Sequence, residues 1–386
     1  MKLKELYKHR TDFTIIGLTG RTGSGCTQMA NLLSNDFNNL NKGLRDLNSF
    51  EDPVFKRKFE ISRNYLQHGD NWKPFKIIKY KNVLLLYVIK KIGNNHELLK
   101  KILIKYYHES KTENNKELVE NKFADLKLIL EKHESILEQI NSLVNFDKIR
   151  KIDSLLVLNK IFFGNEFEEF SQDFYSILEN DNYFRRTRFL HFVACNIRSS
   201  KKSSIENQTN PNNVYTIAEL INTIIKANRK SNNQDLTNII PTRIVIDSLR
   251  NSLEITFFKE RYSAFYMIAT KDIVNNSSQR LNDKFKTKIT DKNQRYKLVQ
   301  KLIDLDETEY KSKDFSNGIF TSPNVENCIQ KSDYHIFNLG KNEIENFLSQ
   351  FKIKNSITDV EKERILNTFL TREEQLMKLI SLIFQP

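Results

Sequence analysis

The feature that most constrains the fold is a glycine-dense turn near the start of this 386-residue chain. A short apolar run over 13–18 leads into the turn, and a helical pattern follows from Gln28 to Leu33. A strand, a glycine-rich loop and a helix in this order are the context of a phosphate-binding loop, because the loop N–H groups and the helix N-terminus both attract an anion. We therefore predict a phosphate-binding loop rather than an ordinary glycine turn. Its residues are Gly20, Arg21, Thr22, Gly23, Ser24, Gly25, Cys26 and Thr27.

The loop departs from the usual motif at one position. Against the pattern G-x-x-x-x-G-K-[ST], Gly20, Gly25 and Thr27 match, but Cys26 replaces the lysine. In an active kinase that lysine bridges the β- and γ-phosphates, whereas a thiol is neutral and a thiolate would repel phosphate. Arg21 lies in the same loop and is a candidate replacement, although its backbone position differs. The sequence thus favours binding or slow turnover over fast phosphoryl transfer.

The charge balance permits anionic partners. The net charge is +13 and the pI is near 9.3, which fits phosphate, nucleotide or RNA binding. The lysines are spread along the chain in runs of mixed sign, so a solvated basic surface explains them equally well. The charge therefore leaves RNA binding open.

The cysteines and the apolar runs indicate a cytoplasmic protein. Cys26, Cys195 and Cys328 are far apart and form no C-x-x-C pair, so a disulfide framework or a cysteine zinc cluster is not expected. The first ten residues are charged and do not resemble a signal peptide. The longest apolar run, 83–89, is too short to span a membrane, and no membrane contact is expected.

Short apolar runs alternate with helical patterns, which is typical of an α/β protein. We predict a P-loop NTPase fold of the nucleoside-monophosphate-kinase type, with a mostly parallel sheet and helices on both faces. The core is expected over 1–93 and 182–345, with a helical insertion over 94–181 and a helical connector or partner-docking segment over 346–386. Amphipathic helices are expected at 361–369 and 373–384. The predicted strands lie at 13–18, 75–80, 83–89, 243–250, 264–269 and 334–338.

The insertion contains a stripe of mainly apolar residues over 119–144, spaced alternately four and three apart. This spacing is typical of a coiled-coil-like seam. The seam either packs within an inserted hairpin or bundle or forms a dimer surface, and we expect a homo-oligomer. His133 lies on the stripe and is interpreted as a packed or hydrogen-bonded histidine rather than a metal ligand.

The predicted strand ends suggest a site at one edge of the sheet. Ligands of open α/β sheets bind at the carboxyl ends of the strands, where the loop, Asp247 and Asn338 are expected to meet. Thr27 and Asp247 are the candidate ligands of Mg²⁺, and the candidate nucleotide is ATP or a (deoxy)nucleotide. The alternative for Asp247 is a cap of the next helix. The candidate catalytic residues are Asp247, Arg21 and Arg250. Arginines that suit a substrate phosphate are Arg185, Arg188, Arg198 and Arg280.

Taken in order, several of these segments resemble one protein family, over about 12–347. The loop at 20–27 is followed by 195–198, by 245–251 with Glu254, and by 261–262; 325–329, Asp333 and Asn338 continue the likeness. In this order they resemble the N-terminal part of the anti-phage dCTP deaminases and, more distantly, nucleoside-monophosphate and dephospho-CoA kinases. The resemblance adds Asn196 to the candidate substrate-binding residues.

The resemblance implies a P-loop kinase-like domain that works with a zinc deaminase acting on deoxycytidine nucleotides, restrained in some members by a small RNA. Deaminase chemistry needs an H-x-E and a P-C-x-x-C motif, and the sequence contains neither. The deaminase domain is therefore expected to lie outside this sequence or in a separate effector chain.

Three functions follow as hypotheses. The leading one is a nucleotide-binding sensor or regulatory module of an anti-phage defence system. The second is an active (deoxy)nucleoside monophosphate kinase that uses ATP, with the charged segment 271–313 closing as a lid. The third is an RNA-binding regulator.

Overall fold

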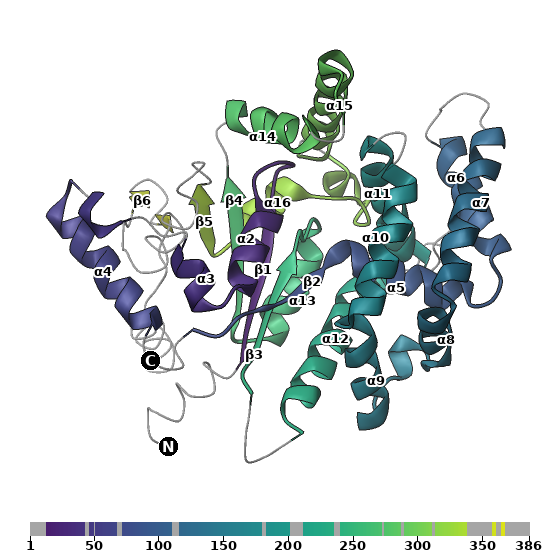
Figure 1. The fold of residues 1–386 in the computed structure, drawn as a ribbon, viewed down its shortest axis with the longest axis horizontal. Helices are drawn as coiled ribbons and strands as arrows, with labels where there is room; N and C mark the ends of the chain where they lie inside the picture. The colour runs from purple at the N-terminus through teal and green to yellow at the C-terminus, as the bar shows by residue number, and fades with distance from the viewer. Residues whose placement is uncertain are drawn as a thin grey trace.

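Figure 1 shows the computed structural model of the chain. The residues that it describes are 13–42, 46–49, 51–67, 72–109, 116–179, 183–200, 211–234, 240–271, 274–286, 289–310, 313–337, 357–359 and 364–366.

Within the described residues, five strands form one parallel sheet in the order β2-β3-β1-β4-β5. The strands are β1 (Phe13–Gly20), β2 (Lys76–Lys79), β3 (Thr242–Asp247), β4 (Phe265–Lys271) and β5 (Tyr334–Phe337). The strand that precedes the glycine loop is central, with β3 on one side and β4 on the other. The α/β prediction with a parallel sheet is confirmed.

The two faces of the sheet bury alternate residues of each strand, as strand geometry requires. Ile15 and Ile246 belong to the larger core, which includes the helical insertion. Ile16, Leu18 and Val245 belong to a smaller core with the helix after the loop. Helices therefore cover both faces (Figure 1). The helices of the smaller core and its flank are α2 (Cys26–Ser34), α3 (Phe37–Lys42) and α4 (Pro53–Gln67).

The larger core contains one element that was wrongly predicted. The run 83–89, expected as a strand, lies inside the helix α5 (Tyr80–Ile92). Every residue of the run is buried. A helix enclosed on all sides is apolar all round, so its sequence shows no helical period and imitates a buried strand. The Leu84-Leu85-Leu86 centre of the run prefers helix over strand, which decides the outcome.

Helices fill the predicted insertion and the region after it. They are α6 (Glu97–Glu109), α7 (Lys116–Lys132), α8 (Glu134–Ser142), α9 (Ile152–Phe162), α10 (Asn165–Glu179), α11 (Tyr183–Ser200), α12 (Thr216–Asn232) and α13 (Ser252–Arg261). The predicted seam packs inside the chain, because Leu126, Leu130 and Ile140 are buried in the larger core. The stripe is thus explained without a second copy. The His133 ring packs on Phe170, with ring centroids 5.5 Å apart, and its Nε2 lies 2.8 Å from a carboxylate oxygen of Asp173, which confirms the prediction for this histidine.

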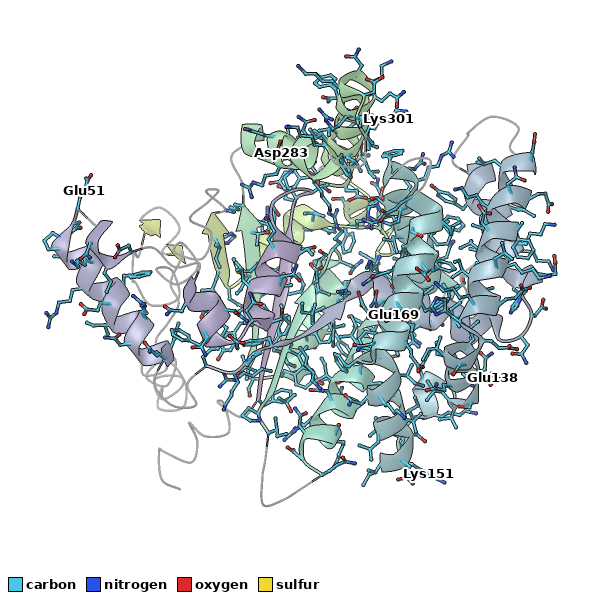
Figure 2. The ribbon with its side chains drawn as sticks, in the orientation of Figure 1. Glu51, Glu138, Lys151, Glu169, Asp283 and Lys301 are labelled. Atoms are coloured by element: carbon cyan, nitrogen blue, oxygen red, sulfur yellow. The ribbon has the colours of Figure 1, made fainter. Side chains whose placement is uncertain are left out.

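Two more helices, α14 (Val274–Lys286) and α15 (Lys292–Tyr310), stand above the end of the sheet where the strands terminate (Figure 1). Asp283 and Lys301 mark them in Figure 2. The short helix α16 (Val325–Gln330) leads into β5.

The C-terminal segment was predicted to be helical. Its described residues instead form two short antiparallel strands, β6 (Ile357–Asp359) and β7 (Arg364–Leu366), so the helix expected over 361–369 is wrong at 364–366. The β-branched residues Ile357, Thr358 and Ile365 favour extended backbone, which an amphipathic period conceals. The remainder of 346–386, and Asn338, lie outside the described residues. Among the helices that are described, none has the length and apolar content needed to cross a membrane.

Candidate functional site

The backbone of the loop requires glycine at three positions, either for its φ angle or for close packing. Gly23 and Gly25 have φ of 85° and 102°, a region that other residues rarely adopt. A Cβ atom on Gly20 would lie 2.5 Å from the carbonyl oxygen of Thr270. Gly25 is the N-cap of α2 and supplies no side-chain hydrogen bond to the helix. The turn therefore leads directly from the central strand into a helix N-terminus, the geometry predicted for a phosphate cradle.

The two predicted metal ligands lie together: Thr27 is in the first turn of α2, and Asp247 is at the carboxyl end of β3. The Thr27 hydroxyl donates to one oxygen of Asp247 at 3.1 Å, and the Ser248 hydroxyl donates to the other at 2.7 Å. Asp247 does not cap the next helix, because Asn251 fills that position and accepts from the Leu253 N–H.

Burial of Asp247, which is 9% exposed, raises the pKa of its carboxyl, and the bonds from Ser248 and Thr27 only partly oppose this. A hydroxyl and a carboxylate are hard oxygen ligands of the kind that Mg²⁺ prefers. No group of three or more His, Cys, Asp or Glu in metal-binding proximity occurs among the described residues. Mg²⁺ at Thr27 and Asp247 would therefore need phosphate oxygens or water as further ligands.

The side chain at the lysine position is half-buried and lies against two hydroxyls. The Cys26 sulfur lies 3.1 Å from the Thr270 hydroxyl, at the end of β4, and 3.9 Å from the Ser24 hydroxyl. Burial, followed by the nearby Asp247 charge, raises the pKa of the Cys26 thiol to about 11. The thiol is consequently neutral near pH 7 and neither supplies the missing charge nor repels a phosphate.

Arg21 points from the loop to α15. Its Nε donates to Asp306 and its Nη2 donates to Glu307, both at 2.6 Å. Its guanidinium lies 5.0 Å from the centre of the Tyr310 ring. Burial alone would lower the pKa of Arg21, but the bonds to the two carboxylates outweigh it and raise the pKa.

Arg250, which follows β3, reaches both the loop and α15. Its Nη2 donates to the Thr22 hydroxyl at 3.1 Å, and its Nη1 donates to Glu309 at 2.6 Å. Glu309 also pairs with Nδ1 of His191 on α11. Burial alone would raise the pKa of Glu309, but the His191 and Arg250 charges hold it below its usual value. The structure therefore places Arg250 beside Arg21 of the loop, and carboxylates of α15 bind both predicted catalytic arginines.

Arg198 has a different role from the one predicted. Its guanidinium is buried, and it donates to Glu254 at 3.0 Å, to the Tyr80 hydroxyl at 2.7 Å and to the Thr321 carbonyl at 2.8 Å. Its three nitrogens are thus each engaged by the protein, and we correct its assignment from substrate binding to an internal ion pair. Glu254 is 0% exposed, so the pair ties α11 to α13.

The other predicted substrate residues stay predictions. Asn196 is buried, and its carbonyl accepts from the hydroxyls of Ser199 and Ser200. The Arg188 guanidinium lies 5.7 Å from the centre of the Phe184 ring on the same helix. Arg185, on α11, accepts from a tyrosine hydroxyl through its carbonyl, and Arg280 is half-buried on α14.

Sequence reasoning missed Thr270 and the acidic end of α15. Thr270 follows directly on a predicted strand, where a hydroxyl at the carboxyl edge is a usable signal. The acidic run that contains Asp304, Asp306, Glu307 and Glu309 stands out within a basic chain, although nothing in its spacing names the loop as its partner.

Comparisons of the chain with protein-family models, with curated proteins and with solved structures find no match.

Proposed function

We propose that this chain is a nucleotide-binding P-loop module that acts as a sensor or regulator, of the kind its sequence resembles in anti-phage defence. The observation that carries the proposal is the hydrogen bond from Thr27 to Asp247 at the mouth of the glycine loop. It joins a hydroxyl and a carboxylate suited to Mg²⁺ beside backbone donors suited to phosphate. These groups are what a Mg²⁺–nucleotide complex requires.

The residues of the loop have separate roles in this proposal. The backbone N–H groups over 20–27 and the N-terminus of α2 hold phosphate oxygens. Thr27 and Asp247 hold Mg²⁺, which also binds the phosphates. Cys26 only fixes the loop to β4 through Thr270.

Binding is favoured over turnover because the lysine position carries no charge. The two arginines beside the loop, Arg21 and Arg250, are bound by carboxylates of α15. A ligand held without rapid consumption suits a sensor, which would pass its occupancy to a zinc-deaminase domain or a separate effector chain in the cytoplasm.

Thermal unfolding with ATP, dATP, dCTP and dCMP, each with and without Mg²⁺, tests the proposal. A ligand that binds only the folded state raises the unfolding temperature in proportion to the logarithm of its concentration above Kd. We expect a Mg²⁺-dependent rise that Thr27→Ala and Asp247→Asn each remove. No rise with any nucleotide would overturn the proposal.

Phosphoryl transfer is the second candidate, favoured by the position of Arg250. Its Nη2 is bonded to Thr22 of the loop, so a cation is already present beside the cradle that lacks a lysine. A coupled assay with ATP and deoxynucleoside monophosphates decides it: turnover that Asp247→Asn abolishes establishes a kinase, and absence of turnover leaves the sensor.

RNA binding is the third candidate, and it rests on the net charge and on the basic segment 185–188. In the basic segment of α11, Arg186 pairs with Glu179 and Arg188 packs on Phe184, so no contact favours RNA over a solvated surface. Binding that weakens steeply with salt would support it.

A further inference from the structure

Carboxylates in the acidic C-terminal turn of α15 bind donors of the glycine loop, and an anion that used the same donors would have to displace them. Both carboxylate oxygens of Asp306 contact the loop: one accepts from the Arg21 guanidinium and the other from the Thr22 backbone N–H, each at 2.6 Å. Asp306 is 3% exposed. An internal carboxylate therefore holds a backbone donor and a cation of the very segment that is expected to bind phosphate.

The neighbouring carboxylates extend this contact. Glu307 takes the second arm of Arg21, and Glu309 takes Arg250. Asp306 also raises the pKa of Arg250 by its charge, so it lies within electrostatic range of both arginines. Three carboxylates thus face two guanidinium groups at the loop. A polyphosphate that approached this arrangement would meet negative charge and no available arginine.

The helix that carries these carboxylates is suited to move. The pair α14–α15 packs around a small apolar core, made of Leu281, Phe285, Leu298, Val299 and Leu302, which is separate from the two cores of the sheet. Among the described residues of α11, Phe184 packs against this core. The pair stands above the sheet (Figures 1 and 2). The side chains of Arg21 and Glu307 are 33% and 38% exposed, so water and an incoming anion reach their bond. Exposed ion pairs are weak and exchange readily, so an incoming anion would open the Arg21–Glu307 pair first. The side chains of Asp306 and Glu309 are only 4% and 8% exposed, so their bonds to the arginines open after it.

We propose that the turn 306–310 of α15 is an intramolecular anionic latch, which a phosphate-bearing ligand displaces from Thr22, Arg21 and Arg250. Displacement makes the two arginines available to the ligand phosphates and releases the end of α15 from the loop. Ligand binding at the loop therefore changes the position of the α14–α15 pair. This inference rests on the proposed function and names its regulation.

The test compares two variants that remove the same charge from the same helix. Asp306→Asn removes a latch carboxylate, whereas Asp304→Asn removes an exposed carboxylate that accepts only from Gln300 on its own helix. The probes are ATP and inorganic tripolyphosphate, titrated by calorimetry at constant salt. We expect Asp306→Asn to bind each probe at least about tenfold more tightly than the wild-type chain, while Asp304→Asn changes Kd less than about twofold.

Glu309→Gln is a second latch variant, which keeps an acceptor for Arg250, and its affinity should rise in the same direction. Amide hydrogen exchange gives an independent readout: ATP should slow exchange over 20–27 and accelerate it over 304–310 in the wild-type chain. A merely structural role for Asp306 predicts no acceleration.

The outcomes separate the two proposals. If the wild-type chain and all variants bind neither probe, the proposed function fails and the latch fails with it. If the wild-type chain binds but Asp306→Asn and Glu309→Gln bind no better than Asp304→Asn, the latch alone is overturned. Binding by Asp306→Asn where the wild-type chain binds nothing detectable would support the latch most strongly.

Discussion

Two arginine–carboxylate systems lie near the same edge of the sheet and differ in what surrounds them. In the inner one, Arg198 and Glu254 have side chains 1% and 0% exposed. In the outer one, Arg21 is 33% exposed and bonds to Asp306 and Glu307 of α15. Both are built from the same residue types, and the sequence marked Arg198 and Arg21 alike as candidates for phosphate.

The role of each arginine depends on which part of the protein supplies its carboxylate. The inner guanidinium is satisfied by a carboxylate, a hydroxyl and a carbonyl from the body of the protein. Removing the carboxylate would leave a buried positive charge that neither a counter-ion nor water compensates. The outer guanidinium is satisfied by carboxylates of α15, a helix that packs with α14 around a small core separate from those of the sheet. In the proposed latch, phosphate oxygens replace these carboxylates, whereas Glu254 is 0% exposed and closed to solvent.

The largest predicted effect breaks the inner system. Glu254→Gln leaves Arg198 as an uncompensated buried cation, and we expect a loss of about 3–5 kcal/mol in the free energy of unfolding. Urea denaturation measures it. The matched control is Glu131→Gln, which removes the exposed partner of Lys127 and should cost less than about 0.5 kcal/mol. Equal losses in the two variants would contradict the contrast between buried and exposed pairs.

The second prediction concerns the carboxylate of the proposed metal site. Asp247→Asn keeps the size of the side chain but removes its charge, and the Mg²⁺-dependent part of nucleotide affinity should fall about 10- to 100-fold. Because burial raises the pKa of Asp247 above the ordinary 3.8, protonation should weaken Mg²⁺-dependent binding at a higher pH than for an exposed aspartate. Calorimetric titrations across pH check both parts, with Asp247→Asn as the reference that retains the titration of the nucleotide phosphates but lacks that of Asp247. A Mg²⁺ effect that survives in the variant would place the metal elsewhere.

A third prediction tests the chemical state of the lysine position. With Cys195→Ser and Cys328→Ser as background, Cys26 is the remaining thiol of the sequence. Its pKa of about 11, compared with 9.0 for a free thiol, makes the thiolate fraction at pH 8 roughly one hundredth of that of a free thiol. Because a more basic thiolate is also more nucleophilic, alkylation should be slower by about 10- to 100-fold. Reaction with iodoacetamide, followed by mass spectrometry from pH 7 to 10, measures the rate. Alkylation as fast as that of free cysteine would show that the thiol is exposed and ionised.

Much of the fold and half of the site follow from local patterns. The parallel sheet was predictable because strand runs alternate with helices, and Thr27 and Asp247 meet because carboxyl ends of parallel strands share an edge. The run 83–89 was misread because full burial erases the period that distinguishes helix from strand. The partners of Arg21 lie 285 and 286 residues away, so only tertiary topology brings them to the loop. The exposed fraction of the side chain, 1% for Arg198 and 33% for Arg21, separates the two arginines, and no local pattern reports it.

The last prediction concerns His335, a titrating side chain that belongs to neither arginine system. Burial, with the nearby Lys271 charge, lowers the pKa of His335 to about 4, compared with 6.5 in an unfolded chain. Between these two pH values the unfolded state binds the additional proton. The free energy of unfolding should therefore decline as pH falls from 6.5 to 4. His335→Gln should flatten this decline, as thermal unfolding across pH would show. Glu309, whose pKa is held below its ordinary 4.5, begins to lose its stabilising contribution only as pH falls below that ordinary value. A decline between pH 6.5 and about 4.5 that persists in His335→Gln would therefore show that ionisable groups other than His335 and Glu309 control stability in this range.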